Sequence, residues 1–350
     1  MSDDSVSPIE TLIRDGAAAH YSSLANEWAA ARDGCAVFPA AHRALARATG
    51  DDRESFLQGM LTNDVRGLEV GSGCAAAFLT DAGKVVSDLR VFRDTDAFDL
   101  DCLSWRIEHL CAGLEKFIIA DDVEIARSAA RAPLVCLEGP GTADVLRSAF
   151  GVAMEVPAFG SAAGECGDHP VVLFGVSDGG GGGTLVVGSL ESRDVVLDAC
   201  RRAGAEAAGV ETLNVLRVEA GIAWAGVDMG EDTLLMEIDP PDTISRTKGC
   251  YLGQEIVERV SARGQVNRTL TAFDIDAEAS RLSGWPLRVE SDSGAVVGQI
   301  TSWVASPATG GTLGMGLLHR KGHEAGSLAV VGAAGRFSCA VSTFPALRRR

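Results

Sequence analysis

The stretch RTKGCYLGQEIVERVSARG, residues 246–264, carries the densest set of reactive residue types in this sequence, and the rest of the chain is interpreted around it. Gly249 and Gly253 bracket Cys250, so the backbone there can turn tightly and approach a ligand or another segment closely. Residues 254–260 are predicted to form a short helix, because their apolar side chains recur at helical spacing. Cys250 would then precede a helix N-terminus, a setting that favours the thiolate.

Basic residues gather around the same stretch. The window 246–268 holds five basic and two acidic residues, whereas the whole chain has a formal net charge of −17. A locally positive site in an acidic protein favours an anionic ligand. Lys248, Arg259 and Arg263 are therefore candidates for binding carboxylates, with a solvated helix face as the alternative. For Cys250 the alternatives are a reactive thiol and a small buried side chain.

The overall composition is that of a globular protein with more than one core. A chain of 350 residues exceeds one ordinary core, so two or three domains are predicted. No apolar run of about eighteen residues exists and the N-terminus is acidic and polar, which predicts a cytoplasmic protein without a membrane partner and with a disordered segment over residues 1–16. The negative net charge disfavours nucleic acid as a partner.

The cysteines and histidines predict no metal site. Nine cysteines are scattered along the chain without a C-x-x-C pair, which predicts reduced thiols rather than a disulfide framework or a zinc or cluster motif. His319 and His323 stand four apart, the spacing of a metal-binding pair on a helix. Because no third ligand follows nearby and Gly322 lies between them, histidines in a loop are the favoured interpretation.

Hydrophobic patterning predicts an α+β body followed by a small all-β domain. Helical spacing and strand alternation mix in the first part of the chain, in two helices (17–32 and 104–119) and two strands (75–80 and 84–92) that flank a hairpin turn at 81–83. From residue 268 onward, short strands joined by Gly/Ser turns predict a β-barrel. The expected division is a disordered N-terminus, an α+β domain of two lobes over residues 17–266 and a barrel over residues 267–346.

Three charged residues in apolar segments are further candidates. Asp88 alternates with apolar neighbours in a predicted strand, where it either accepts a hydrogen bond from a ligand or lies on the polar face. Arg217 and Glu219 stand two apart in Leu-Arg-Val-Glu-Ala, and in a strand both side chains would point the same way. They would form either an acid–base pair or a structural salt bridge.

Two glycine-rich segments superficially resemble nucleotide-binding loops. In Gly139-Pro-Gly141 the third glycine of the dinucleotide fingerprint is replaced by Asp144, and the proline removes an amide donor. Residues 179–183 are five consecutive glycines, but no Lys-Ser/Thr pair follows to complete a P-loop. We predict a helix-packing turn at the first segment and a flexible hairpin linker at the second.

The eight residues KGCYLGQE, 248–255, resemble the K-G-C-Y-x-G-Q-E signature of the YgfZ family of folate-binding proteins, which are related to the aminomethyltransferase (T-protein) of the glycine cleavage system. The resemblance implies a three-lobed ring of two α+β lobes with the T-protein folate-binding fold plus a C-terminal β-barrel, around a folate pocket. It also implies a role in iron–sulfur cluster assembly or repair that uses tetrahydrofolate. Further segments resemble landmarks of this superfamily in the same order: 56–58, 62–65, 83–89, 139–140, 216–221 and 297–302.

The resemblance also implies roles for particular residues. Cys250 would carry out thiol chemistry with Lys248 as its activator, and Asp88 would act in catalysis or contact the folate. The other residues expected to bind the folate are Arg217, Asn63, Tyr251, Gln254, Glu255 and Arg259. The expected partners are the folate and iron–sulfur client or assembly proteins.

Two departures separate this chain from the aminomethyltransferases it resembles. Those enzymes have paired aspartates where this chain has Ser87-Asp88, and a G-Y-T-G-E-type segment where residues 184–190 contain no glutamate. The cysteine of the signature is not part of the T-protein pattern, so its presence favours the YgfZ branch. The alternatives are a folate-dependent aminomethyltransferase or demethylase and a non-catalytic scaffold with the folate-binding fold, so whether the chain is an enzyme stays open.

Overall fold

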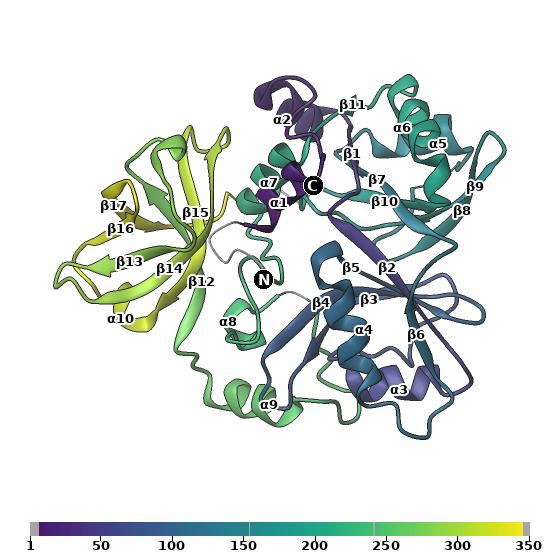
Figure 1. Ribbon diagram of the computed structural model, residues 1–350, viewed down its shortest axis with the longest axis horizontal. Helices are drawn as coiled ribbons and strands as arrows, with labels where there is room; N and C mark the ends of the chain where they lie inside the picture. The colour runs from purple at the N-terminus through teal and green to yellow at the C-terminus, as the bar shows by residue number, and fades with distance from the viewer. Residues whose placement is uncertain (1–6, 154, 241, 346–350) are drawn as a thin grey trace.

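Two open β-sheets and one closed β-barrel organise the computed structural model, which describes residues 7–153, 155–240 and 242–345. The barrel lies on one side of the molecule and the two open sheets lie on the other, with the N-terminal helix between them (Figure 1). This is the mixed α+β architecture with a C-terminal barrel that the sequence predicts, so the predicted fold class is confirmed.

The first open sheet is antiparallel, with the strand order β3-β4-β5-β2-β6. Two helices, α3 and α4, close one of its faces and share an apolar core with it. The predicted hairpin joins β3 to β4 and is confirmed. Helix α4 begins three residues later than predicted, because a 3₁₀ turn at Ser104–Arg106 precedes it. The elements are β2 (Arg43–Thr49), α3 (Arg53–Met60), β3 (Gly73–Leu79), β4 (Val85–Arg93), β5 (Phe98–Leu103), α4 (Ile107–Glu115) and β6 (Glu124–Arg127).

The second open sheet has the strand order β11-β1-β7-β10-β9-β8. Helices α5 and α6 cover its outer face with a separate apolar core. Residues 179–182 of the glycine run lie between the antiparallel strands β9 and β10, where the sequence predicts a hairpin linker, and Gly183 is the first residue of β10. The elements are β1 (Ala36–Pro39), β7 (Ala132–Glu138), α5 (Thr142–Phe150), β8 (Ser161–Cys166), β9 (His169–Phe174), β10 (Gly183–Gly188), α6 (Arg193–Arg202) and β11 (Glu206–Ala207).

The inner faces of the two open sheets pack against each other. Phe92 of β4 stacks on Phe174 of β9 with ring centroids 3.9 Å apart, and residues of both sheets belong to one apolar core. Side chains of β4 alternate between its two faces, so Asp88 and Arg90 share the face of Phe92 that is turned toward the second sheet. The polar side of this strand therefore faces a protein interior and not bulk water.

The barrel closes in the strand order β12-β15-β14-β13-β16-β17 around its own apolar core. Its strands are β12 (Arg268–Ile275), β13 (Leu287–Ser291), β14 (Val296–Ser306), β15 (Gly311–His319), β16 (Leu328–Gly332) and β17 (Gly335–Ser342). The short helix α10 (Arg320–His323) follows β15, so His319 ends a strand and His323 ends this helix. Two further helices, α8 (Leu235–Ile238) and α9 (Gln254–Arg263), lead from the body to the barrel.

Helix α7 (Val210–Glu219) lies between the body and the barrel. The interpretation of this segment as a strand is wrong. Eight of its ten residues are buried, because it packs on α2 (Leu24–Asp33) on one side and on β14 and β15 on the other. A helix that is buried nearly all round lacks the apolar stripe from which helical spacing is recognised.

The N-terminal segment is more ordered than the sequence predicts. Pro8–Arg14 form helix α1, which Ser7 caps and which buries Ile9, whereas residues 1–6 lie outside the described part of the chain. Helix α2 begins at Leu24 and not at residue 17, because the Ser23 hydroxyl accepts the Asn26 N–H at 3.2 Å and so caps it. Across the described ranges, no helix has the length and apolarity that crossing a membrane requires.

Candidate functional site

A network of buried charges fills the interface between the two open sheets. Arg43 of β2 binds Asp101 of β5 through two hydrogen bonds, of 3.0 and 2.6 Å. Arg90 of β4 binds the same carboxylate at 3.2 Å and also binds Asp178, which follows β9 in the chain. Each guanidinium and each carboxylate is thus compensated within the network, as buried charges require. Three strands of one sheet (β2, β4 and β5) and a loop of the other are joined by this network.

Asp88 lies beside this network. Its Oδ1 accepts the backbone N–H of Ala225 at 3.3 Å. Burial raises the pKa of the Asp88 carboxyl, and this effect exceeds the lowering of the pKa by the positive charges of Arg43 and Arg90. A carboxyl whose pKa is raised keeps its proton to higher pH than a free aspartic acid, which is a property used in proton transfer. The structure therefore places Asp88 half-buried on the face of β4 that is turned toward the second sheet, where the sequence left a ligand contact and an exposed strand face as alternatives.

Aromatic rings line the same region. Trp224 stacks on His42 with centroids 5.6 Å apart, and Trp105 lies against its ring at 5.7 Å. The Trp105 indole N–H donates to the Ala225 carbonyl at 2.8 Å. Ala225 is thus held through both its backbone N–H and its backbone C=O, which fixes the position of the Asp88 carboxyl.

Arg217 is fully buried and acts away from Asp88. Its Nη1 donates to Asp228 at 2.7 Å and its Nη2 donates to Ser302 of the barrel at 2.7 Å, while Asp228 also accepts the Ser302 hydroxyl. The structure pairs it with Asp228 and not with Glu219, which binds Arg32 at 2.7 Å. Helical geometry separates residues two apart, so the expected pairing of Arg217 with Glu219 is wrong.

The loop that carries Cys250 docks on the β3–β4 hairpin. Gly253 has φ of 80°, and a Cβ at this position would lie 2.5 Å from the carbonyl oxygen of Thr80. Gly83 of the hairpin is equally restricted, since a Cβ there would lie 2.9 Å from Ile256. A glycine at 253 is thus required for the close approach of the loop to the hairpin. Cys250 itself is exposed.

Lys248 serves the loop as an anchor. Its ammonium group donates to three backbone carbonyls at the end of α3 and just after it, those of Gln58, Leu61 and Asn63, at 2.7, 2.6 and 2.8 Å. Burial lowers the pKa of this amine to about 8. Because all three donors of the ammonium are engaged with carbonyls, the expectation that Lys248 activates Cys250 is corrected.

Tyr251 is the other buried residue of the loop. Its side chain is 6% exposed, the Lys248 ammonium lies 5.3 Å from its ring centroid, and burial raises its pKa to about 12. Its hydroxyl has no hydrogen-bond partner among the residues that the structure describes. A buried hydroxyl without a partner is uncommon and costly, so it is a candidate for contact with a bound molecule.

The remaining residues expected at the site have structural partners. Asn63 donates to the carbonyls of Ala75 and Asp242, and Gln254 accepts the Tyr251 N–H at 3.3 Å. Glu255 and Arg259 form an exposed ion pair one turn apart on α9, in line with the alternative of a solvated helix face. The side chain of Arg263 lies outside what the structure describes.

Sequence reasoning missed the residues at the centre of the buried network. The donor atoms of His42, Cys136 and Asp178 all lie within 4.8 Å of one another, and the three side chains are buried. These residues come from three distant parts of the chain, so no local spacing could have brought them together. The only signal in the sequence was an aspartate directly before the run of glycines.

Cavities large enough for a small molecule include two that the described residues form. One, of about 620 Å³, lies between α1, α7 and the barrel and is lined by Asn214, Val227, Ser302, Trp285 and Trp303 among others. The buried Oδ1 of Asn214 has no hydrogen-bond partner among the described residues.

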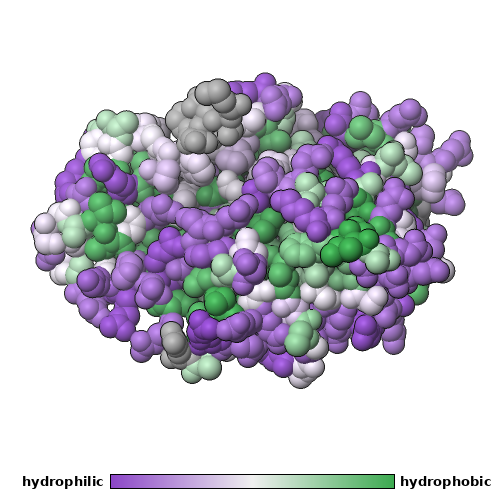
Figure 2. Space-filling view, turned by 60° about the horizontal axis from the view of Figure 1, so that its bottom comes forward, coloured by the Kyte–Doolittle hydropathy of each residue, from purple (hydrophilic) through white to green (hydrophobic). Residues whose placement is uncertain are grey.

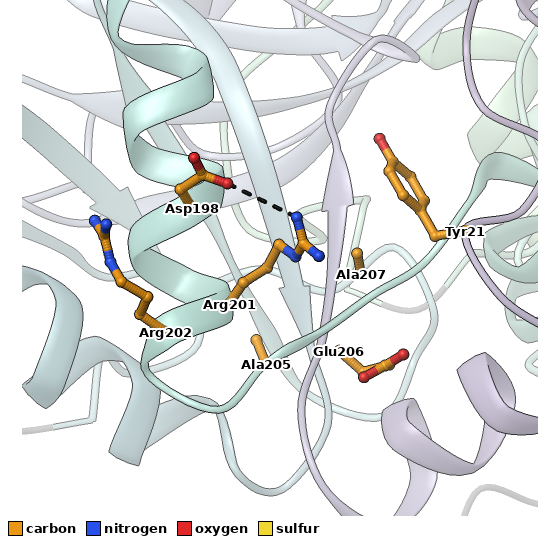
Figure 3. A pocket seen from close by; sticks show the side chains of 7 residues that line it. All are labelled: Tyr21, Asp198, Arg201, Arg202, Ala205, Glu206 and Ala207. Atoms are coloured by element: carbon orange, nitrogen blue, oxygen red, sulfur yellow. Dashed lines mark ion pairs between the residues drawn. The ribbon is translucent and has the colours of Figure 1, made fainter.

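The other cavity, of about 580 Å³, lies on the surface beside α6 (Figure 3). Arg201 and Asp198 form an ion pair across 3.8 Å at its edge, and Tyr21 faces it from the other side (Figure 3). Figure 2 shows the molecule after a rotation that brings the bottom of Figure 1 toward the viewer. On this face, hydrophobic patches lie between hydrophilic residues (Figure 2). The cavity beside α7 is the one that adjoins the buried residues described above, because Ser302 of its lining contacts Arg217.

Comparisons with known proteins agree with this architecture. The family model of the GCVT N-terminal domain matches residues 16–248. An aminomethyltransferase of Chlorobium phaeobacteroides is 26% identical over 82% of this chain and 80% of its own length, and one of Rubrobacter xylanophilus is 27% identical over 84% and 79%. Aminomethyltransferase T of the Bartonella henselae glycine cleavage system has the same fold, with a TM-score of 0.79, 19% identity and 98% of each chain covered.

Proposed function

This chain belongs to the family of the GCVT N-terminal domain, and from that membership we propose that it binds tetrahydrofolate. From the resemblance of residues 248–255 to the YgfZ signature we propose further that it acts in iron–sulfur cluster assembly or repair through Cys250. The family and the fold support the folate half of the proposal. The exposure of Cys250 supports the thiol half. We place this activity in the cytoplasm, with iron–sulfur client or assembly proteins as partners.

The cavity between α7 and the barrel fits a folate in size and lining. Small-molecule sites commonly measure about 300 to 1,000 Å³, and this cavity measures about 620 Å³. Trp285 and Trp303 offer flat apolar surfaces for a planar ring, and the Trp285 indole is fixed by a hydrogen bond to Thr301 at 2.7 Å. The unpaired Oδ1 of Asn214 supplies an acceptor for a ring N–H.

Three of the residues expected to bind the folate keep a place in the proposal. Asp88 lies outside the cavity lining and accepts the N–H of Ala225, two residues before the lining residue Val227, so its part in the proposal is to hold a proton behind the site. Arg217 would act as a positioning residue through Ser302 of the cavity lining. Tyr251 lies outside that lining, and its unpaired hydroxyl is proposed as a separate contact with the ligand. A bound tetrahydrofolate supplies ring nitrogens that carry a one-carbon unit.

The observation that supports the thiol half of the proposal is that Cys250 is exposed and the other cysteines are not. Of the nine cysteines, all within the described part of the chain, Cys250 alone is exposed. The environments of the other eight thiols raise their pKa, mainly through burial, and disfavour their thiolates. A thiol that serves partner proteins must reach solvent, and in this chain one position meets that requirement.

Two measurements test the two halves separately. Calorimetric titration of the chain with tetrahydrofolate should show saturable binding, and Trp303→Ala should weaken this binding at least tenfold. No binding at millimolar tetrahydrofolate would refute the folate half of the proposal. For the thiol half, Cys250→Ser should abolish rescue of a cell with defective iron–sulfur enzymes, whereas Cys339→Ser, at a buried cysteine of the barrel, should still rescue it. Full rescue by Cys250→Ser would overturn the assignment.

An aminomethyltransferase is the second candidate. The names of the relatives and the raised pKa of Asp88 favour it, because proton transfer at the folate would use such a carboxyl. Against it, Thr184–Gly188 run through the buried strand β10 without a carboxylate side chain that could bind a pterin. Folate-dependent release of ammonia from an aminomethyl donor, lost in Asp88→Asn, would favour this candidate. Absence of both folate binding and Cys250 alkylation would indicate a non-catalytic scaffold.

A further inference from the structure

The geometry points to a second site: we propose that His42, Cys136 and Asp178 bind one divalent transition-metal ion such as Zn²⁺. His42 lies between β1 and β2, Cys136 lies in β7, and Asp178 lies between β9 and β10. Asp178 Oδ2 is 2.8 Å from His42 Nε2 and 3.4 Å from Cys136 Sγ, and the sulfur is 4.0 Å from the same ring nitrogen. Imidazole, thiolate and carboxylate are the three ligand types that zinc takes in proteins.

The donor atoms of His42, Cys136 and Asp178 surround one point, and the three side chains are not arranged as a catalytic triad. In a nucleophile–base–acid triad the nucleophile contacts one ring nitrogen and the carboxylate contacts the other. Here the Cys136 sulfur and the Asp178 carboxylate both approach Nε2 of His42. Three donor atoms that surround one point are arranged as ligands are.

The distances require only a small adjustment around an ion. Bond lengths of about 2.0 Å to nitrogen or oxygen and about 2.3 Å to sulfur place tetrahedral ligands about 3.3 to 3.6 Å apart. The observed separations of 2.8, 3.4 and 4.0 Å lie on both sides of that range. Binding of the ion releases the proton of the Cys136 thiol to solvent, and the imidazole of His42 binds through Nε2 with its remaining proton on Nδ1.

The surrounding charges leave one oxygen of Asp178 for the ion. Arg90 binds Oδ1, and Arg43 lies 3.8 Å from that same oxygen, so the guanidinium groups orient the carboxylate while Oδ2 faces the histidine and the cysteine. The charged groups around the site are three guanidinium groups (Arg43, Arg90 and, beside Asp88, Arg106) and four carboxyl groups (Asp88, Asp101, Glu138 and Asp178). A divalent cation brings two positive charges and the Cys136 thiol loses one proton, so the site gains one positive charge. The carboxyl groups outnumber the guanidinium groups and can compensate this charge.

Outer contacts hold His42 and Asp178 in place. Trp224 stacks on the His42 ring, and the backbone N–H groups of Asp178 and Gly179 donate to Glu138 Oε1 at 2.6 and 3.2 Å. Such contacts behind the ligands are typical of metal sites.

Cobalt provides a direct test in the full chain with Cys250→Ser, which removes the one exposed thiol. One equivalent of Co²⁺ should give visible d–d bands and a thiolate-to-cobalt charge-transfer band in the near ultraviolet. Cys136→Ser should remove the charge-transfer band and weaken binding at least tenfold, whereas Cys200→Ser, a buried cysteine of α6, should keep both. No charge-transfer band at excess Co²⁺, or a band that persists in Cys136→Ser, would overturn the proposal.

A second measurement stands if Cys136→Ser does not fold. X-ray absorption of the zinc-loaded Cys250→Ser chain should show one sulfur at about 2.3 Å with nitrogen or oxygen at about 2.0 Å. A coordination shell without sulfur would refute the site. Because both readouts are independent of folate, failure of the metal site leaves the folate proposal untouched, and the reverse also holds.

Discussion

Tyr251→Phe removes one oxygen atom from the interior and tests whether the unpaired hydroxyl exists to meet a ligand. The ring and its contact with the Lys248 ammonium at 5.3 Å remain, so the change is confined to the hydroxyl. A buried hydroxyl without a partner costs about 1 to 3 kcal/mol. We therefore expect the variant to unfold with a free energy about 1 kcal/mol higher than the parent at pH 7.

The same variant should change the response to high pH. Burial raises the pKa of Tyr251 to about 12 in the folded chain, above the ordinary value of about 10 for a tyrosine. Between these values the unfolded state has lost the proton and the folded state retains it, so the unfolded state binds fewer protons and stability falls as pH rises. A shift of this size corresponds to at most about 2.7 kcal/mol, and this loss should be absent in Tyr251→Phe.

Urea denaturation at pH 7 and pH 10.5 measures both effects, with unchanged m-values as the check on two-state behaviour. Tyr21→Phe is the matched control, because Tyr21 is the only other tyrosine and is 46% exposed. If the hydroxyl contacts the folate, Tyr251→Phe should also bind tetrahydrofolate about tenfold more weakly, which is about 1.4 kcal/mol. A variant less stable than the parent at pH 7 would show that the hydroxyl already has a partner, and the reasoning would fail.

Three further substitutions test the anchors of the site. Lys248→Met should lower the unfolding free energy by about 3 kcal/mol, because three carbonyls lose a charged donor, and urea denaturation measures it. Gly253→Ala should lower the unfolding free energy by about 3 kcal/mol, which thermal denaturation measures as a lower melting temperature. Gly264 is also at positive φ, but no atom lies within 4 Å of a Cβ there, so Gly264→Ala should lower the unfolding free energy by only about 1 kcal/mol. Arg217→Met should cost about 4 kcal/mol by leaving Asp228 buried without its cation, and equal stability in Arg217→Met would contradict the assigned pairing.

Local patterns in the sequence predicted the parts of the fold that depend on neighbours in the chain. The β3–β4 hairpin follows from strand alternation and the turn at 81–83, and the barrel follows from short strands with Gly/Ser turns. Helix α7 was misread because tertiary packing buries it nearly all round, and such a segment has no distinctive period. The start of α2 was misplaced because the Ser23 cap outweighs the alanine-rich segment before it.

The candidate site was harder to predict because its contacts join distant segments. The sequence placed Lys248 beside Cys250, but its partners are carbonyls about 190 residues earlier, beginning with Gln58. The ligands of the proposed metal site are separated by 94 and 42 positions. Such juxtapositions arise from the packing of two sheets, and a single sequence contains no local signal for them.

The clamp between α7 and the barrel bears on how tightly a ligand can bind. Arg217 reaches Ser302, and Glu219 accepts the Ser306 hydroxyl at 2.6 Å, so two buried charges of one helix fix one strand of the barrel. The two walls of the cavity are therefore held in register before any ligand arrives. Preorganised walls spare the ordering cost of closure, so affinity at this site should respond mainly to the contacts that the ligand itself makes.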